Sequence, residues 1–275
     1  MRLSIITINY NNYDGLEKTI NSVVSQIFKD FEWIVIDGGS TDGSRELLEQ
    51  YSSCFSYWVS EPDKGIYNAM NKGIKKSHGD YLLFLNSGDW LSSPTSLDES
   101  INNQIDADVL YGNVQFFKDD VKVGERVYDD ALSLKYVIDN SLAHNCSFIK
   151  RELIASIGYN EHYKIVSDKE FFLKQMLANK QFVHVNKFVS CFSLDGISST
   201  NLELALKEKQ TMIKTIVPKC VLRDCEIIDR LIESKEKFTN QAVEIDSFYK
   251  RGGLYKKSVA GLIRAFRLFS GLSKK

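Results

Sequence analysis

The sequence contains little of what would place it in several large classes of protein. It has 3 prolines and 5 cysteines among 275 residues. The cysteines are scattered and form no C-x-x-C pair: Cys54, Cys146, Cys191, Cys220 and Cys225. This pattern suits neither a disulfide framework nor a zinc site, so we expect reduced thiols and a cytoplasmic location.

Long apolar runs are also missing. The first apolar run, Leu3–Ile8, passes at once into the polar run Asn9–Asn12, and no small-residue cleavage site follows. We therefore expect no signal peptide. No stretch approaches the roughly 20 apolar residues that cross a bilayer, so we expect no membrane span.

Two phosphate-binding motifs are absent as well. Neither G-x-G-x-x-G nor G-x-x-x-x-G-K-[ST] follows the first predicted strand. Their absence argues against dinucleotide cofactors and P-loop chemistry. A nucleotide diphosphate bound to this chain would need a metal ion to neutralise its charge.

The apolar residues that are present predict alternating strands and helices. Strands are expected at 3–8, 31–36, 55–59 and 81–85. Helical spacing begins near residues 15, 42 and 66, and Thr41 or Asp42 is the expected cap of the second helix. This order predicts an α/β fold with a doubly wound, mostly parallel sheet.

The rest of the chain predicts a small antiparallel extension and a helical C-terminal region. An antiparallel strand pair is expected at 108–116 and 121–128. Further on we expect helices at 132–138, 151–157 and 168–178 and a strand at 182–192. From residue 201 the pattern is helical, with breaks near Pro218 and Gly252. We divide the chain into a domain of residues 1–200 and a helical extension of residues 201–275.

Polar clusters follow three of the predicted parallel strands. They are Thr7 with Asn9, residues 37–42, and residues 86–89. The carboxyl ends of such strands meet at one edge of the sheet, where ligands bind. Asp89 follows a buried strand and is a candidate to hold a divalent cation at that edge. The alternative is that Asp37 and Asp89 are turn residues that bond their own backbone.

Six short motifs occur one after another along the chain. They are Thr7-x-Asn9, DGGSTDG at 37–43, EPDKGIYNAMNKG at 61–73, GDYLLFLNSGD at 79–89, HNCSF at 144–148 and KIVSD at 164–168. Together they resemble the family 2 glycosyltransferases of the GT-A fold over about the first 200 residues. The resemblance implies a GT-A-like enzyme. Such an enzyme moves a sugar from a nucleotide donor, usually a UDP-sugar, to an acceptor hydroxyl with inversion at the anomeric carbon.

The resemblance also implies which residues meet the donor nucleotide. It places Thr7 and Asn9 near the base, Asp37 on the uracil or ribose, Asp63 in a nucleotide-side loop, and Asn71 on a helix beside the donor. Ser198 and Ser199 resemble a mobile loop that closes over the donor.

Asp168 matches the family's catalytic base, the carboxylate that takes the proton of the acceptor hydroxyl. It begins a predicted helix whose N-terminal dipole would keep it ionised, although capping alone also accounts for an aspartate there. Spacing does not separate Asp168 from Glu170. By resemblance His144 contacts the donor diphosphate or its metal, and a structural histidine is the alternative.

The turn at 86–89 matches the family's acidic metal motif but departs from its usual form. Asn86 and Gly88 stand where two acids are expected, which leaves Asp89 as the one carboxylate. An asparagine carbonyl and two phosphate oxygens can still complete the shell of a hard cation. We therefore expect Mn²⁺ or Mg²⁺ to bind more weakly or in a donor-dependent way, with Asn86 on the donor side.

The end of the chain differs in charge from the rest. The net charge is −1, yet residues 251–275 carry seven Lys or Arg and no acid, which leaves −8 for the first 250 residues. At the helical period, apolar residues from Tyr255 to Phe269 form a stripe opposite the basic ones. A basic amphipathic helix is typical of contact with an anionic membrane surface. A helix folded back on the catalytic domain is the alternative.

These features predict a transferase of the kind found in bacterial surface polysaccharide biosynthesis. We expect a glycan or lipid-linked acceptor, a peripheral position on the inner face of the plasma membrane, and no nucleic acid partner. A non-catalytic nucleotide-sugar binding protein is one alternative, because the acidic motif is depleted. A sugar-nucleotide pyrophosphorylase is a weaker one, because Asn9–Asp14 is not a glycine-rich basic loop.

Overall fold

The computed structural model describes residues 2–101, 106–194 and 201–251, with side chains described up to residue 241. Their contacts divide the chain into two compact units, Met1–Ile216 and Val217–Lys275. The sequence placed the division near residue 200. The later division follows from the helix α8 (Leu202–Ile216), whose Met212 is fully buried and whose Glu208 accepts hydrogen bonds from the backbone of Lys164 and Ile165.

The first unit is built on a mixed sheet, as predicted. Among the described residues, nine strands form one sheet in the order β3-β2-β1-β4-β8-β6-β9-β5, with β7 paired to β6. The parallel half contains β1 (Leu3–Asn9), β2 (Phe31–Asp37), β3 (Tyr57–Ser60) and β4 (Tyr81–Phe84). The other half contains β5 (Trp90–Leu91), β6 (Val109–Lys118), β7 (Val121–Arg126), β8 (Ser147–Lys150) and β9 (Phe182–Ser193).

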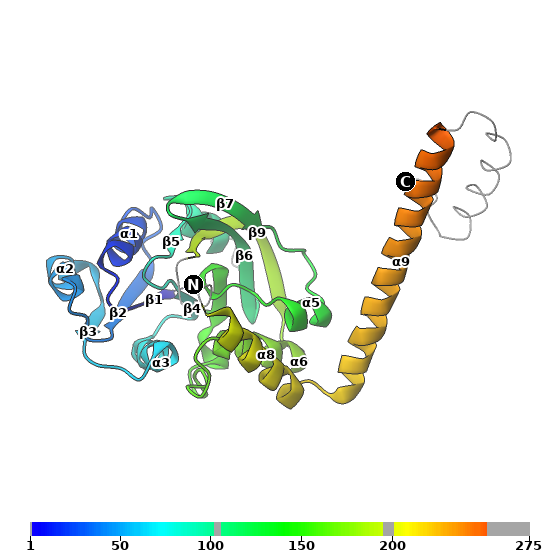
Figure 1. The fold of residues 1–275 in the computed structure, drawn as a ribbon. Coiled ribbons are helices and arrows are strands. Elements are labelled where there is room, and N and C mark those ends of the chain that lie inside the picture. The colour runs from blue at the N-terminus through cyan, green and yellow to red at the C-terminus, as the bar shows by residue number, and fades with distance from the viewer. Residues whose placement is uncertain (1, 102–105, 195–200, 252–275) are drawn as a thin grey trace. The chain divides into compact units, whose positions relative to one another are not determined.

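Helices connect the strands of the parallel half and cover both faces of the sheet. They are α1 (Tyr13–Val24), α2 (Ser44–Gln50) and α3 (Ile66–Lys76). Figure 1 shows α1 and α3 on opposite sides of the strands that they connect. The α3 helix packs closely on β1, because a Cβ atom on Gly73 would lie 2.4 Å from Ile6 Cγ2. This close contact fixes the helix that follows the 61–65 loop.

The mixed half carries the shorter helices α4 (Ser96–Ile101), α5 (Leu134–Asp139) and α6 (Ser167–Leu177). The antiparallel pair β6–β7 confirms the predicted hairpin. Two local predictions are wrong. The α2 helix is capped by Gly43 in a left-handed conformation, while Asp42 accepts from Ser44 N one residue later. The helix expected at 151–157 is a single 3₁₀ turn, Arg151–Leu153, after which the chain turns at Gly158 with φ +64°.

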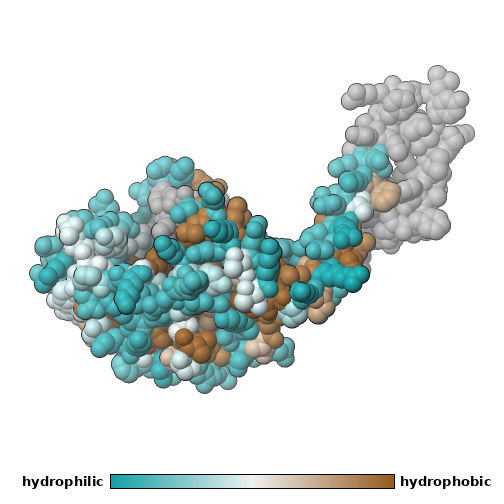
Figure 2. Space-filling view, turned by 60° about the horizontal axis from the view of Figure 1, so that its bottom comes forward, coloured by the Kyte–Doolittle hydropathy of each residue, from teal (hydrophilic) through white to brown (hydrophobic). Residues whose placement is uncertain are grey.

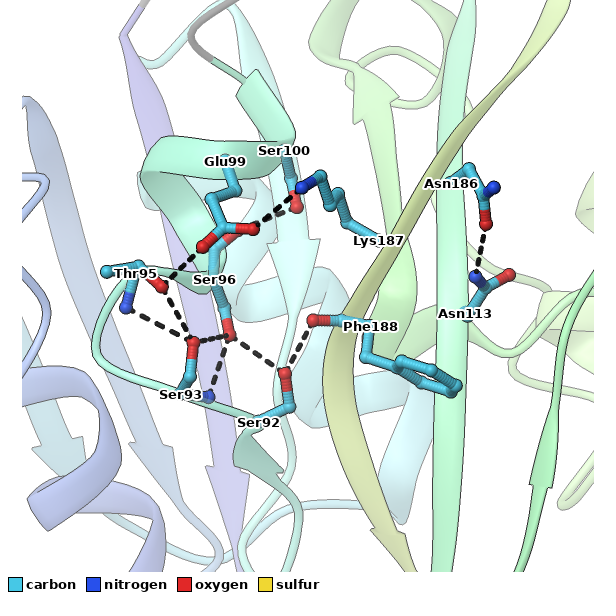
Figure 3. A network of polar contacts seen from close by, with 10 residues as sticks. All are labelled: Ser92, Ser93, Thr95, Ser96, Glu99, Ser100, Asn113, Asn186, Lys187 and Phe188. Atoms are coloured by element: carbon cyan, nitrogen blue, oxygen red, sulfur yellow. Dashed lines mark hydrogen bonds and ion pairs between the residues drawn. The ribbon is translucent and has the colours of Figure 1, made fainter.

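A serine-rich turn ties the start of α4 to β9 (Figure 3). Ser93 N donates to Ser96 Oγ at 2.8 Å, Ser92 Oγ donates to the carbonyl of Phe188, and Glu99 pairs with Lys187 at 3.0 Å. These contacts hold β9 beside the segment that follows the 86–89 turn.

The second unit contains the helix α9 (Lys219–Arg251), which follows the predicted break at Pro218. Five of its large apolar residues are exposed: Ile227, Ile228, Leu231, Ile232 and Phe238. Figure 2 shows apolar and charged residues side by side along it. Within the part of the chain that the structure describes, no helix is long and apolar enough to cross a membrane. The break at Gly252 and the basic stripe at 251–275 lie outside the residues whose side chains are described.

Candidate active site

The carboxyl ends of the parallel strands meet as predicted. Asn9 lies opposite Asp37 in the β1–β2 pair, and Asp37 lies opposite Ser60 in the β2–β3 pair. Asn9 Nδ2 donates to Asp37 Oδ1 at 2.8 Å, and Ser60 Oγ donates to Asp37 Oδ2 at 2.6 Å. The first two polar clusters are therefore joined by side-chain contacts at one edge of the sheet.

Asp37 is fully buried and saturated with hydrogen bonds. Besides Asn9 and Ser60, it accepts from Ser40 Oγ at 2.5 Å, Ser40 N at 2.9 Å and Gly39 N at 3.2 Å. Burial alone would raise the pKa of Asp37, but these donors outweigh it and lower the pKa. Asp37 is thus an ionised anchor of the 37–40 loop. Its contact with uracil or ribose stays a prediction.

Thr7 and Asn9 lie at different depths. Thr7 is completely buried, and its Oγ1 accepts from the indole of Trp33 at 3.0 Å. Asn9 is also buried, and its Oδ1 has no hydrogen-bond partner among the described residues. A buried amide oxygen without a donor is costly, so Asn9 is the better candidate of the two to meet a ligand.

Asp63 lies against the Asp37 loop. Its Oδ1 accepts from Gly65 N at 2.7 Å in the turn that begins α3. Glu61 N donates to Asp37 O at 3.0 Å, and a Cβ atom on Gly38 would lie 2.6 Å from Asp63 Oδ2. The two loops are therefore neighbours, an arrangement that agrees with the expected nucleotide-side position of Asp63.

The 86–89 turn is held by the first helix. Gly88, at φ +97°, donates its N–H to Gly15 O at 3.0 Å, and Thr19 Oγ1 donates to Asp89 O at 2.7 Å. The Asp89 carboxylate is 6% exposed and accepts from Ser193 N at 3.2 Å. The turn is thereby fixed between α1 and the end of β9.

Burial raises the pKa of Asp89 to about 6, against the opposing effects of the His144 charge, Ser193 N and the Asn145 amide. Beside it, Asn145 is completely buried, and both polar atoms of its amide have no hydrogen-bond partner among the described residues. The same holds for Asn86 Oδ1. Oxygens in need of a partner therefore gather around Asp89.

This donor set can be compared with the needs of a divalent cation. A hard cation prefers carboxylate and amide oxygens, which Asp89 and Asn86 provide. Among the described residues no group of three or more His, Cys, Asp or Glu could hold a metal alone. The residues therefore fit a cation that also takes oxygens from a bound diphosphate, and they do not fit a cation held by protein alone.

Asp168, His144 and Asn86 form a chain of side-chain contacts. His144 Nδ1 lies 3.2 Å from Asp168 Oδ2, and His144 Nε2 lies 3.1 Å from Asn86 Nδ2. The chain links the first turn of α6 to the 86–89 turn of the sheet. With both ring nitrogens engaged, His144 serves here as a bridge, and its predicted contact with the diphosphate stays a prediction.

The pairing sets the charge of both partners. Burial alone would raise the pKa of Asp168, but the hydrogen bond and charge of His144 outweigh it, helped by Tyr67, and the net pKa is lowered. Burial alone would lower the pKa of His144, but the contacts with Asp168 and the charge of Asp89 raise it. Asp168 is therefore ionised at neutral pH, as a general base must be.

Glu170 is held elsewhere. Its Oε1 lies 2.9 Å from Lys174 Nζ and accepts from Asn160 Nδ2 at 3.4 Å. It takes no part in the His144–Asn86 chain. The structure thus separates Asp168 from Glu170, which sequence spacing alone did not.

Asn71 makes contacts of a structural kind. Its amide binds both backbone groups of Tyr159 and also donates to Glu161 Oε1 at 2.8 Å. A contact of Asn71 with the donor stays a prediction. Sequence reasoning missed the roles of Thr19, Ser193 and Asn145, whose types and spacing carry no motif. Ser198 and Ser199 lie outside the described residues.

Comparisons with known proteins agree with this geometry. A family model described as "Glycosyl transferase family 2" matches residues 4–164, more than half of the chain. An uncharacterized glycosyltransferase of Mycobacterium tuberculosis is 38% identical over 184 residues, which is 64% of this chain and 69% of the relative. A PGL/p-HBAD biosynthesis glycosyltransferase of Mycobacterium bovis is 29% identical over 61% of this chain and 67% of the relative.

Solved structures show the same fold at low sequence identity. S. aureus TarS 1–349 in complex with UDP-GlcNAc has a TM-score of 0.59 at 19% identity, over 73% of this chain and 61% of that one. The mannosyltransferase PcManGT of Pyrobaculum calidifontis, in complex with GDP-Man and Mn²⁺, has a TM-score of 0.53 at 16% identity, over 70% and 56%. The chain therefore spans less than two thirds of these two structures.

Proposed function

The chain belongs to glycosyl transferase family 2, and from this premise we propose that it transfers a sugar from a UDP-sugar to an acceptor hydroxyl with inversion at the anomeric carbon. The observation that carries the proposal is the contact chain from Asp168 through His144 to Asn86. It sets an ionised carboxylate next to the turn that carries Asp89. The UDP-GlcNAc complex of a protein with the same fold supports the choice of nucleotide.

The proposed reaction needs one base. The acceptor oxygen forms a bond to the anomeric carbon, and the bond from that carbon to the diphosphate oxygen breaks, with its electrons leaving on UDP. Asp168 takes the proton that the acceptor hydroxyl loses. His144 fixes the orientation of Asp168 through its Nδ1 contact. The carboxylate then meets the hydroxyl in one geometry, which contributes to the rate.

A divalent cation, Mn²⁺ or Mg²⁺, completes the proposal. Asp89 would hold it, with the buried amide oxygen of Asn86 as a second ligand. When bound, the cation would neutralise the diphosphate as it leaves. The Mn²⁺ in the GDP-Man complex of PcManGT supports this part of the proposal.

The test is the pair of variants Asp168→Asn and Glu170→Gln. Loss of a general base lowers the rate by about 10² to 10⁴, so Asp168→Asn should lose turnover of the donor in that range. Glu170→Gln, two residues away on the same helix, should keep it. Turnover by Asp168→Asn at the wild-type rate would contradict the proposal.

The same pair separates an enzyme from a binding protein. An enzyme loses turnover in Asp168→Asn and keeps its affinity for UDP, measured by calorimetry. A nucleotide-sugar binding protein shows no turnover in any variant, including the wild type. That second outcome would replace the transferase by the binding protein.

We further propose that the acceptor is a glycan or a lipid-linked glycan and that residues 251–275 bind the inner face of the plasma membrane. The seven basic residues of this segment support the proposal, since each contributes about 1 kcal/mol near an anionic surface. The full chain should co-sediment with phosphatidylglycerol vesicles and not with phosphatidylcholine vesicles. Replacement of Lys256, Lys257, Arg264 and Arg267 by glutamine should abolish co-sedimentation, and its persistence would contradict the proposal.

A further inference from the structure

A tyrosine of α3 reaches the carboxylate of α6. Tyr67 Oη lies 2.9 Å from Asp168 Oδ1 and 2.7 Å from Ile165 O. Tyr67 and Asp168 are 101 residues apart in the sequence. Asp168 Oδ2 is already engaged by His144, so Tyr67 takes the other oxygen of the same carboxylate.

The position of the hydroxyl is fixed by packing. Tyr67 is 5% exposed, and its ring lies 5.5 Å from the ring of Tyr159 at an angle of 51°. The α3 helix that carries it is pressed against β1 at Gly73. Asn71, one helical turn after Tyr67, binds the backbone of Tyr159. The hydroxyl therefore has little freedom to leave Asp168.

We propose that Tyr67 is a positioning residue for the base. Its hydroxyl holds one oxygen of Asp168, His144 holds the other, and the carboxylate is thereby aimed at the acceptor. This inference rests on the proposed role of Asp168. It deepens that role, because it says which side chain of α3 makes the carboxylate an oriented base.

The hydroxyl has one proton and two acceptors, Asp168 and the carbonyl of Ile165. While Asp168 is ionised, the proton is drawn to the charged oxygen, because hydrogen bonds to ionised groups are the stronger ones. Once Asp168 has taken a proton from the acceptor, the hydroxyl can donate to Ile165 O and is not left unpaired. Tyr67 therefore stabilises the ionised base more than the protonated one.

Other groups also act on Asp168, and each has to be distinguished from Tyr67. His144 pairs with it, and the N–H of Lys169 donates to it. The Lys169 side chain and the Tyr159 hydroxyl act through charge and proximity. Tyr159 is the useful control, because its hydroxyl is buried and has no hydrogen-bond partner among the described residues.

The first measurement does not depend on activity. A double-mutant cycle of Tyr67→Phe and Asp168→Asn in urea unfolding measures the coupling of the two side chains. Because a hydrogen bond to a charged group is involved, we expect a coupling of about tenfold in the unfolding equilibrium constant. The same cycle with Tyr159→Phe should give a coupling near one. Equal coupling in both cycles would overturn the proposal.

The second measurement tests positioning itself. Tyr67→Phe should lower kcat for donor turnover about tenfold with the donor KM unchanged, because orientation is lost and donor binding is not. The acid limb of its pH–rate profile should move up by about one pH unit, since the ionised base loses a donor. Tyr159→Phe should keep the wild-type limb.

The outcomes separate this inference from the proposed function. A wild-type limb and wild-type kcat in Tyr67→Phe would overturn the positioning role, while loss of turnover in Asp168→Asn would still support the base. An active Asp168→Asn would overturn the base and the role of Tyr67 in catalysis together. A protein without any turnover would remove the proposed function, and the unfolding cycle would still decide whether Tyr67 and Asp168 are coupled.

Discussion

Asn71 holds the backbone of Tyr159 from both sides. Its Nδ2 donates to Tyr159 O at 2.9 Å, and its Oδ1 accepts from Tyr159 N at 2.7 Å. Gly158, just before, has φ +64°, and a Cβ atom on it would lie 2.7 Å from Asn71 Oδ1. The pair thus fixes a left-handed turn between β8 and α6, only a few residues before the base.

Replacing Asn71 by leucine should be costly. It leaves two backbone groups of the buried Tyr159 without partners, so we expect the free energy of unfolding to fall by roughly 2 kcal/mol or more. Lys75→Ala, on the exposed side of the same helix, should change it by about 0.5 kcal/mol or less. Urea unfolding of both variants is the measurement. Equal stabilities would show that the clamp does not matter.

Metal dependence can be tested through Asp89. UDP at about 100 times its dissociation constant should stabilise the protein by about 2.7 kcal/mol in a thermal-shift assay. We expect this shift with Mn²⁺, little of it with EDTA, and none of the Mn²⁺ effect in Asp89→Asn. GDP, CDP and dTDP serve as controls for the base. A shift that survives EDTA would mean that Asp89 is not a metal ligand.

The buried lysine after the base should make stability depend on alkaline pH. Burial, together with the charge of Lys209, lowers the pKa of Lys169 to about 7. Unfolded lysine titrates near pH ~10.4, so between these two values the unfolded chain binds more protons and the free energy of unfolding rises with pH. The part of this rise that is due to Lys169 should be missing in Lys169→Met.

Urea unfolding at about pH 7 and about pH 9 measures this difference between wild type and variant. Lys209→Met gives a graded control. It removes a repelling charge, so the pKa of Lys169 should rise and the pH dependence should shrink without vanishing. The same rise in Lys169→Met as in the wild type would contradict the assignment.

Much of the parallel half could be predicted from the sequence, because buried strands and amphipathic helices leave a periodic pattern. The strand β4 agrees with the expected 81–85, and all of these residues are buried. The start of α1 was harder. It begins at Tyr13 because Asn12 caps it through Gly15 N, and an asparagine in a polar loop gives no unique signal of this.

The site could be predicted only in part, for a related reason. Strand order placed Asn9 and Asp37 at one edge, and their contact confirms it. Periodicity also placed Tyr67 and Asn71 on one face of α3. It did not show that this face meets the segment before α6, since a helical period indicates which residues share a face and not what the face touches.

The contact between Tyr67 and Asp168 bears on how the chain acquires its reactivity. Partners 101 residues apart meet only after the intervening chain has been ordered, and contacts of such sequence separation are the slow ones to form. Individual helices and hairpins form long before. During refolding, the return of donor turnover should lag behind the return of helical circular dichroism. Turnover would then be a clock for the completion of the fold.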